Sequence, residues 1–358
     1  VWSGVMTGRI LHGATPLDLI EAYTDYAGRM RPLPDWVHQG VIAGLQGGQR
    51  QGFEVGVHHP PAALVGGQLQ QPAHVGQRLG RALQRYPRDE FVLSTKVGRI
   101  IRDNPGGTGW DEQFYRVPRT TKRVLDYTAD GVRTSIEESL DRLGLDRIDL
   151  VYIHDPDEYW DDAINGAVPA LQELRAAGTI GGFGAGMNQS AMLERFIREG
   201  DADVVMVAGR YTLLEQGALD DLLPAAAETG ASVVIAGVYN SGLLARPRPP
   251  ADANYDYETV PAEVLQRAHA IADVCERFGT TLPDAAVAFV LRNPSVVSVA
   301  FGVSRPEQLD QNLERLAASV PTNTAPHELW TELEAPGLIR TAGQCCRSLA
   351  LPRPPLVM

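Results

Sequence analysis

The chain has 358 residues, 44% of them hydrophobic and 21% charged, which excludes a wholly disordered chain and allows a large buried core. Acidic residues outnumber basic ones by 44 to 32, and this net charge of −12 argues against nucleic acid or an anionic membrane as the main partner. Only three cysteines occur, with Cys345 and Cys346 adjacent, and no apolar run is long enough to span a membrane. We therefore expect a cytoplasmic protein without a disulfide framework.

The N-terminal part of the chain gives weak structural signals. A helix is predicted over residues 16–26, where Gly28 follows it, and short strands are predicted at 41–45 and 53–57. Any further strand before residue 91 has no clear period in the sequence.

Residues 58–77 differ in composition from the rest of the chain. They contain no Asp, Glu, Lys or Arg and have neither a helical nor a strand period, which indicates a flexible loop. His58, His59 and His74 lie here, but no Cys, Asp or Glu accompanies them, so we expect no metal site.

From residue 91 onward, short β-branched runs alternate with stretches of helical period. The continuous apolar runs are typical of parallel strands that are covered on both faces by helices. The predicted strands are 91–97, 148–154, 180–186, 204–208, 232–237 and 297–303. The predicted helices are 130–143, 168–177, 262–278 and 283–291. This alternation fits either a doubly wound sheet or a closed barrel whose first two strands come from residues 1–90.

Two polar residues end apolar strands of this set. Lys96 closes FVLSTKV and His154 closes IDLVYIH. Barrel enzymes carry their catalytic groups at the carboxyl ends of the strands, and a buried ammonium group needs a partner. Each residue also has a purely structural explanation: the lysine could lie at the rim of the barrel, and the histidine could be a hydrogen-bonded core residue. Both explanations would have to be true at once, on adjacent strands. We therefore favour a functional site.

Several motifs resemble those of the aldo-keto reductase family. GVRTSIEESLDRLGLDRIDLVYIHDP (131–156) is similar to the family signature, in which a helix and a strand lead to the active-site His, and STKVGR (94–99) is similar to the strand of the active-site Lys. Three further motifs follow in the family's order: RYTLLEQ (210–216), YNSGLL (239–244) and FGVSRPEQLDQNLE (301–314). The resemblance covers about residues 79–316 and is closest to dehydrogenases of L-fucose or D-arabinose. It implies an α/β fold, a (β/α)8 TIM barrel that is incomplete or irregular over the first two strands.

The resemblance also implies an activity. The family uses an Asp, a Tyr, a Lys and a His; Lys96 and His154 match the last two. In the family, Tyr transfers the substrate proton, Lys lowers its pKa and His orients the carbonyl or hydroxyl. The implied cofactor is NADP or NAD, and the implied partner is a small sugar or aldehyde; the oligomeric state is left open.

The cofactor residues are implied in the same way. Asn188 matches the residue that holds the nicotinamide carboxamide. The adenosine-phosphate segment is matched by Gly302, Ser304, Arg305, Gln308 and Asn312. Pro306 opens a helix directly after Ser304 and Arg305, so free N–H groups and a cation would face a phosphate. Arg305 favours a 2′-phosphate and hence NADP, and an ordinary capped helix is the structural alternative.

The family's Asp and Tyr have no counterpart in the sequence. Counting back from Lys96 at the family's spacing reaches Val65 and Gln70, and neither can transfer a proton. Of the nearby tyrosines, Tyr86 precedes the Lys96 strand and therefore belongs at the wrong end of the barrel. Tyr127 and Tyr115 follow that strand on the correct face, but nothing in the sequence positions either as a base.

An acidic stretch follows His154 directly. Its members are Asp155, Asp157, Glu158, Asp161 and Asp162. We favour a solvated acidic loop, with recognition of sugar hydroxyls as the alternative.

A second resemblance lies near the N-terminus. YTDYAGRMRPLPDWVHQGVIAGLQGG (23–48) is similar to a piece of a family 31 glycoside hydrolase of the sulfoquinovosidase type, but the carboxylates of glycoside hydrolysis are absent, so we expect no glycosidase activity. The expected segments are a glycosidase-like fragment at 1–52, an irregular foreign segment at 53–78, a reductase-like barrel at 79–335 and a mobile tail at 336–358. Our hypothesis is that a fusion with a local change of reading frame joined them.

Two functions follow from these patterns. The first is an NAD(P)-dependent oxidoreductase that transfers hydride between nicotinamide and C1 of an aldose or a small aldehyde. The second is an impaired or chimeric barrel that binds a dinucleotide without turnover, because the family's Asp and Tyr are missing.

Overall fold

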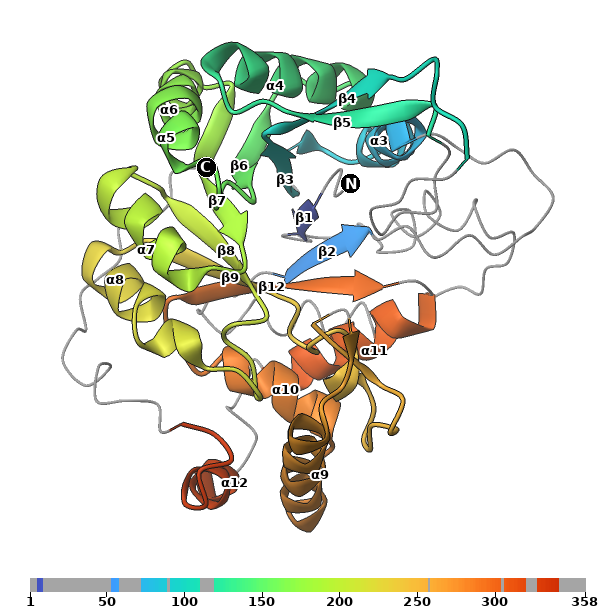
Figure 1. The fold of residues 1–358 in the computed structure, drawn as a ribbon, viewed down its shortest axis with the longest axis vertical. Helices are drawn as coiled ribbons and strands as arrows, with labels where there is room; N and C mark the ends of the chain where they lie inside the picture. The colour runs from blue at the N-terminus through green and yellow to red at the C-terminus, as the bar shows by residue number, and fades with distance from the viewer. Residues whose placement is uncertain are drawn as a thin grey trace.

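The computed structural model describes residues 5–8, 53–57, 72–88, 91–109, 119–256, 258–303, 306–319 and 327–340. Eight strands of this part of the chain form a closed barrel, and helices lie around its outside (Figure 1). The predicted helix at 16–26, the predicted strand at 41–45, Ser304 and Arg305 lie outside the described residues.

The barrel strands follow the order β1-β2-β12-β9-β8-β7-β6-β3 around the ring. Their bounds are β1 (Val5–Gly8), β2 (Phe53–Val57), β3 (Val92–Val97), β6 (Ile148–His154), β7 (Ile180–Met187), β8 (Val204–Ala208), β9 (Ser232–Ala236) and β12 (Val296–Val303). The six strands predicted after residue 90 are confirmed to within one residue, because continuous β-branched runs suit positions buried on both faces. All six run parallel to their neighbours in the set, and β2 runs parallel to β12.

The eighth strand of the barrel, between β2 and β3, does not follow the parallel pattern of the others. β1 runs antiparallel to both of its neighbours, with Val5 opposite Gly56 of β2 and Ser94 of β3. The sequence did not predict this strand, since VMTG is too short to show a period. An extended segment in this place pairs the backbone groups that would otherwise remain open at the edges of β2 and β3. The expected irregularity over the first two strands is therefore present.

The helices cover the outer face of the barrel. Their bounds are α3 (Pro72–Leu83), α4 (Ala129–Leu143), α5 (Trp160–Asp162), α6 (Val168–Ala176), α7 (Ser190–Glu199), α8 (Leu222–Thr229), α9 (Ala262–Arg277), α10 (Leu282–Val290), α11 (Pro306–Ser319) and α12 (His327–Glu334). A π-helix at Ala163–Ala167 joins α5 to α6. Two short 3-10 helices lie in the loops after β8 and β9, at Gly217–Leu219 and Leu243–Ala245. The four predicted helices are confirmed with their ends shifted by at most one residue. Helix α4 shows why: the Thr128 side chain accepts from the N–H of Gly131, and Gly144 ends the helix in the left-handed conformation.

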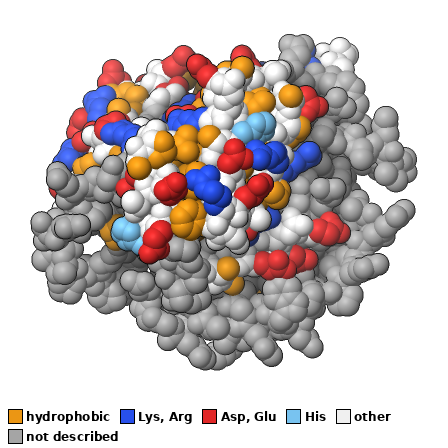
Figure 2. All heavy atoms as spheres, turned by 90° about the horizontal axis from the view of Figure 1, so that it is seen from below, with side chains coloured by type: hydrophobic (Ala, Val, Ile, Leu, Met, Phe, Trp, Pro, Cys, Tyr) orange, Lys and Arg blue, Asp and Glu red, His pale blue; other side chains and the backbone are white. Residues whose placement is uncertain are grey.

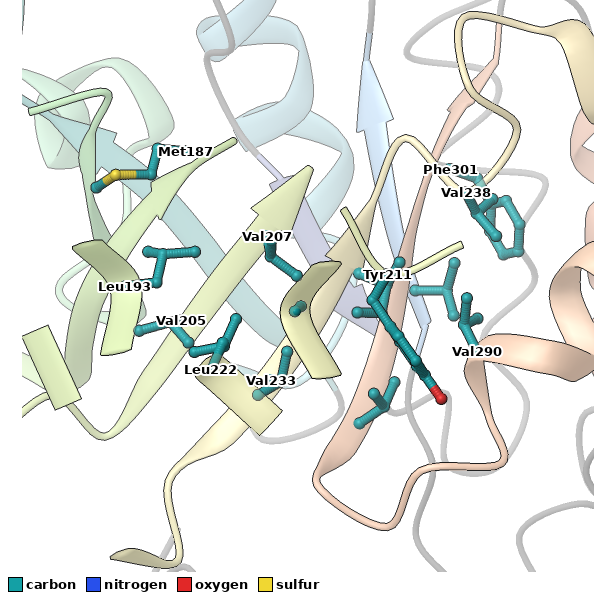
Figure 3. Close-up of a cluster of buried hydrophobic side chains, with 14 of the residues drawn as sticks. Met187, Leu193, Val205, Val207, Tyr211, Leu222, Val233, Val238, Val290 and Phe301 are labelled. Atoms are coloured by element: carbon teal, nitrogen blue, oxygen red, sulfur yellow. The ribbon is translucent and has the colours of Figure 1, made fainter. Parts of the chain in front are cut away.

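Side chains alternate between the inside and the outside of the barrel. Val205 and Val207 of β8 and Val233 of β9 point outward and pack beside Leu193 of α7 and Leu222 of α8 (Figure 3). A smaller inner cluster is formed by Tyr152, Val204, Met206, Val234, Ala236 and Ala300. This two-residue period fixes which strand residues face the interior, where the site described below lies.

Two small hairpins lie outside the barrel. Strands β4 (Arg99–Asp103) and β5 (Thr121–Leu125) pair directly after β3, and β10 (Asn254–Tyr255) pairs with β11 (Glu258–Thr259). The first hairpin lies beside α4 (Figure 1), to which an Arg102–Glu138 ion pair of 2.7 Å connects it.

The surface carries both signs of charge. On the face in Figure 2, acidic and basic side chains are interspersed among hydrophobic ones. Over the ranges that the structure describes, no helix is both long and apolar enough to cross a membrane.

Candidate active site

Lys96 and His154 lie together on the inner face at the carboxyl ends of two neighbouring strands. Lys96 is opposite Tyr152 in the β3–β6 register, and His154 follows Tyr152 by two residues on the same face. His154 is in turn opposite Gly186 of β7. A Cβ added to Gly186 would lie 3.7 Å from Cε of Lys96, so the lysine side chain reaches across β6 toward the position of His154.

His154 is buried, with 8% of its surface exposed. Burial lowers the pKa of its imidazole well below 6.5, and the charges of Lys96 and Arg99 lower it further. The ring is therefore neutral over the physiological range. A neutral imidazole donates through one ring nitrogen and accepts through the other, which suits it to orient a carbonyl or hydroxyl oxygen.

Arg99 and Asp155 lie directly beside this imidazole. Oδ2 of Asp155 is 3.2 Å from Nε2 of His154 and accepts a hydrogen bond of 2.7 Å from Nη2 of Arg99. Burial raises the pKa of Asp155, whereas the charge of Arg99 opposes that rise. Arg99 was not predicted as a site residue, and Asp155 was interpreted as part of a solvated acidic loop. The position of Asp155 next to His154 was the available sequence signal for a role in the site. Its pairing with Arg99 could not be predicted, because the two residues are 56 positions apart.

Tyr127 forms hydrogen bonds with the backbone of His154 and Asp155. Its hydroxyl donates to the carbonyl oxygens of His154 and Asp155, at 2.8 and 2.9 Å. Burial raises the pKa of Tyr127 to about 12. Gly98 has a φ of +100° and lies against the Tyr127 ring. A Cβ added to Gly98 would be 2.3 Å from that ring. Tyr127 therefore holds the backbone of the site and is not placed as a base; Tyr115 lies outside the described residues.

Four of the predicted cofactor residues are described, and they lie on elements at or next to the same end of the barrel. Asn188 is half-buried in the loop between β7 and α7, and Gly302 is exposed near the end of β12. Gln308 is half-buried on α11. Asn312, also on α11, is buried, and its Oδ1 accepts from the Tyr239 hydroxyl at 2.8 Å. This bond connects α11 to the loop after β9.

That loop, which contains the motif YNSGLL (239–244), holds a polar side chain to which the sequence assigned no role. Asn240 is 3% exposed, yet neither Oδ1 nor Nδ2 has a partner within the described residues. Asn240, Ser241 and Gly242 all have positive φ, and a Cβ added to Gly209 at the end of β8 would lie 3.8 Å from Nδ2 of Asn240. A buried amide without partners is costly, so it points to a bound polar ligand at this edge of the barrel. The residues here therefore fit a dinucleotide, and the Asn-Ser-Gly run was the available signal.

The described residues contain no cluster of three or more His, Cys, Asp or Glu that could hold a metal ion. His58 and His59 lie outside these residues.

Comparison with known proteins places the chain in a family. The model of the Aldo/keto reductase family matches residues 71–333. D-threo-aldose 1-dehydrogenase of a Pseudomonas species is 47% identical over 270 residues, which cover 74% of this chain and 80% of the relative. Pyridoxal 4-dehydrogenase of Microbacterium luteolum is 37% identical over 284 residues, which cover 73% of this chain and 80% of the relative. The family match begins at residue 71 and gives no support to the glycoside hydrolase likeness of residues 23–48.

Solved structures agree on the fold. A glycerol dehydrogenase from Gluconobacter oxydans superposes with a TM-score of 0.53 at 22% identity, over 74% of this chain and 78% of that chain. An aldo-keto reductase from Bacillus halodurans gives a TM-score of 0.55 at 22% identity, over 72% of this chain and 76% of that chain.

Proposed function

The chain belongs to the aldo/keto reductase family, and from this premise we propose that it is an NAD(P)-dependent dehydrogenase that oxidises an aldose of the L-fucose or D-arabinose class at C1. The observation that carries the proposal is the placement of Lys96 beside a neutral, buried His154 at the carboxyl end of the barrel. The 47% identity to D-threo-aldose 1-dehydrogenase supports an aldose as the substrate.

The roles of the two residues follow from their charges. Oxidation at C1 would pass a hydride to the nicotinamide of the bound cofactor and the hydroxyl proton to a solvent water, since the family's Tyr has no counterpart here. Negative charge develops on the C1 oxygen as that proton leaves. The half-buried Lys96 ammonium stabilises that charge. The His154 imidazole donates a hydrogen bond to the same oxygen and orients the sugar.

The cofactor would supply the hydride acceptor, its nicotinamide ring. Asn188 would hold the carboxamide, Asn240 would satisfy its amide on a polar group of the cofactor, and Gln308 with Asn312 would lie near the adenosine end. We assign the 2′-phosphate of NADP to Arg305.

The cofactor assignment has a direct test. If Arg305 binds the 2′-phosphate, Arg305→Ala should weaken NADPH binding by at least about tenfold and change NADH binding much less. Quenching or enhancement of NAD(P)H fluorescence on titration measures both affinities. Equal losses for the two cofactors would show that Arg305 does not read the 2′-phosphate.

The activity is tested by supplying L-fucose or D-arabinose to the full chain with NAD or NADP and following the reduced cofactor. The proposal expects sugar-dependent reduction. Cofactor binding without reduction for any aldose would instead favour a barrel that binds a dinucleotide without turnover.

A further inference from the structure

Asp155 has its conformation fixed from three directions. Its backbone N–H donates to the carbonyl of Gly186 at 3.1 Å, and its own carbonyl accepts from the Tyr127 hydroxyl at 2.9 Å. The Arg99 guanidinium holds the carboxylate from the β4 side at 2.7 Å. The residue also has a φ of +45°, a conformation that costs free energy for a residue other than glycine. So constrained a residue beside a catalytic candidate suggests a role beyond solvation of the loop.

The constraint places one carboxylate oxygen against one ring nitrogen. Oδ2 of Asp155 is 3.2 Å from Nε2 of His154. An ionised carboxylate repels a nitrogen lone pair and attracts an N–H hydrogen, so this short approach favours the hydrogen on Nε2. Three cations of the described residues also act on the pKa of His154, and none of them can accept a hydrogen bond: Lys96 of β3, Arg99 of β4 and Arg123 of β5.

We propose that Asp155, held in place by Arg99, is a positioning residue that keeps His154 in the tautomer with hydrogen on Nε2. The catalytic consequence rests on the proposed function: a hydrogen on Nε2 is what His154 needs in order to donate to the oxygen of the reacting carbon. The substrate oxygen then accepts that hydrogen. Without the carboxylate, the neutral ring is free to place its hydrogen on Nδ1, and the donor is lost.

Asp155→Asn is the direct test. Asparagine tolerates a positive φ and has nearly the same shape, so the backbone of the loop should be kept. Its amide can donate to Nε2, which favours the other tautomer. We expect the ¹⁵N chemical shifts of His154 to move from a ring protonated at Nε2 to a mixture or to the Nδ1 form. His154→Gln identifies the resonances by their loss.

Activity provides the second readout. We expect Asp155→Asn to lower kcat on the order of 10–100-fold, with little change in KM or in NADPH affinity. Arg99→Lys keeps a cation near the carboxylate and should recover much of the activity that Arg99→Gln loses. Asp162→Asn, which removes an exposed carboxylate of the same acidic stretch, serves as the control and should leave both readouts unchanged.

The outcomes separate this inference from the proposed function. An unchanged His154 tautomer in a folded Asp155→Asn protein would overturn the inference, whatever the enzyme does with aldoses. A wild-type chain that shows the Nε2 tautomer but no aldose oxidation would leave the positioning intact and contradict the function. Loss of kcat with an unchanged tautomer would assign Asp155 another role and would also overturn the inference.

Discussion

A lysine ammonium and a neutral histidine, next to each other at the end of two strands, are the residues on which the proposed chemistry depends. Lys96→Met removes the charge but keeps the aliphatic length, and His154→Gln keeps a hydrogen-bonding side chain without a ring. Both should lower kcat by on the order of 10²–10⁴-fold. NADPH fluorescence titrations should give nearly unchanged affinities, since neither residue is assigned to the cofactor. A variant that keeps full turnover would remove that residue from the mechanism.

The buried His154 also predicts how stability depends on pH. Its pKa in the folded protein lies well below the ordinary value of 6.5, so below that pH the unfolded chain binds a proton that the folded chain resists. Stability should therefore fall as the pH drops below about 6.5, by up to about 1.4 kcal/mol per pH unit from this group, and should gain nothing from it above that pH.

Urea unfolding of the wild type and His154→Gln at pH 7.5 and 5.5 measures this contribution. The acid-induced loss of unfolding free energy should be smaller in the variant, because the histidine that resists protonation is gone. Equal losses in both proteins would show that His154 is not held neutral.

At the level of residues, the sequence located the two groups but not their surroundings. Lys96 and His154 stand out because each polar residue closes an apolar strand. Arg99 and Asp155 form a pair only once β3 and β6 are neighbours, and the unpaired amide of Asn240 is visible only when burial is known. Contacts between residues far apart in the chain have no local signal, so these parts of the site came from the structure.

The barrel strands also depend on small residues at close approaches. A Cβ on Gly184 of β7 would lie 1.7 Å from the carbonyl oxygen of Val204 on β8, and backbone cannot give way as a flexible side chain can. Gly184→Ala should therefore lower the free energy of unfolding by about 2–4 kcal/mol. Thermal unfolding measures the loss.

A matched control comes from Gly217, where an added Cβ would have no neighbour within 4 Å and φ is not positive. Gly217→Ala should be close to neutral. Equal stability of the two alanine variants would contradict the close approach of Gly184 on β7 to the backbone of β8.

The elements themselves show where sequence periodicity succeeds. The six barrel strands and four of the helices after residue 90 were predicted, because parallel strands in a barrel are long apolar runs and their helices are amphipathic. The hairpin of β4 and β5 was missed, since half of its residues are charged, and β1 was missed because four residues cannot display a period.

The barrel as a whole closes through an antiparallel strand from the N-terminal part of the chain. If β1 pairs with both β2 and β3, the amides of residues 5–8 should exchange with deuterium far more slowly than those of an unstructured peptide. Hydrogen exchange followed by mass spectrometry measures this, with the β3 peptide as the internal reference for a paired strand. Exchange of residues 5–8 at the unstructured rate would mean that the ring is closed in another way.

The complete molecule is proposed to bind a nicotinamide dinucleotide and to oxidise an aldose at C1. The most direct test gives the full chain L-fucose or D-arabinose with NAD or NADP and records the reduced cofactor over time, beside a titration of NADPH binding. Sugar-dependent reduction that is lost in His154→Gln, with NADPH binding retained in both proteins, is the predicted result. NADPH binding by the wild type with no reduction on any aldose would contradict it.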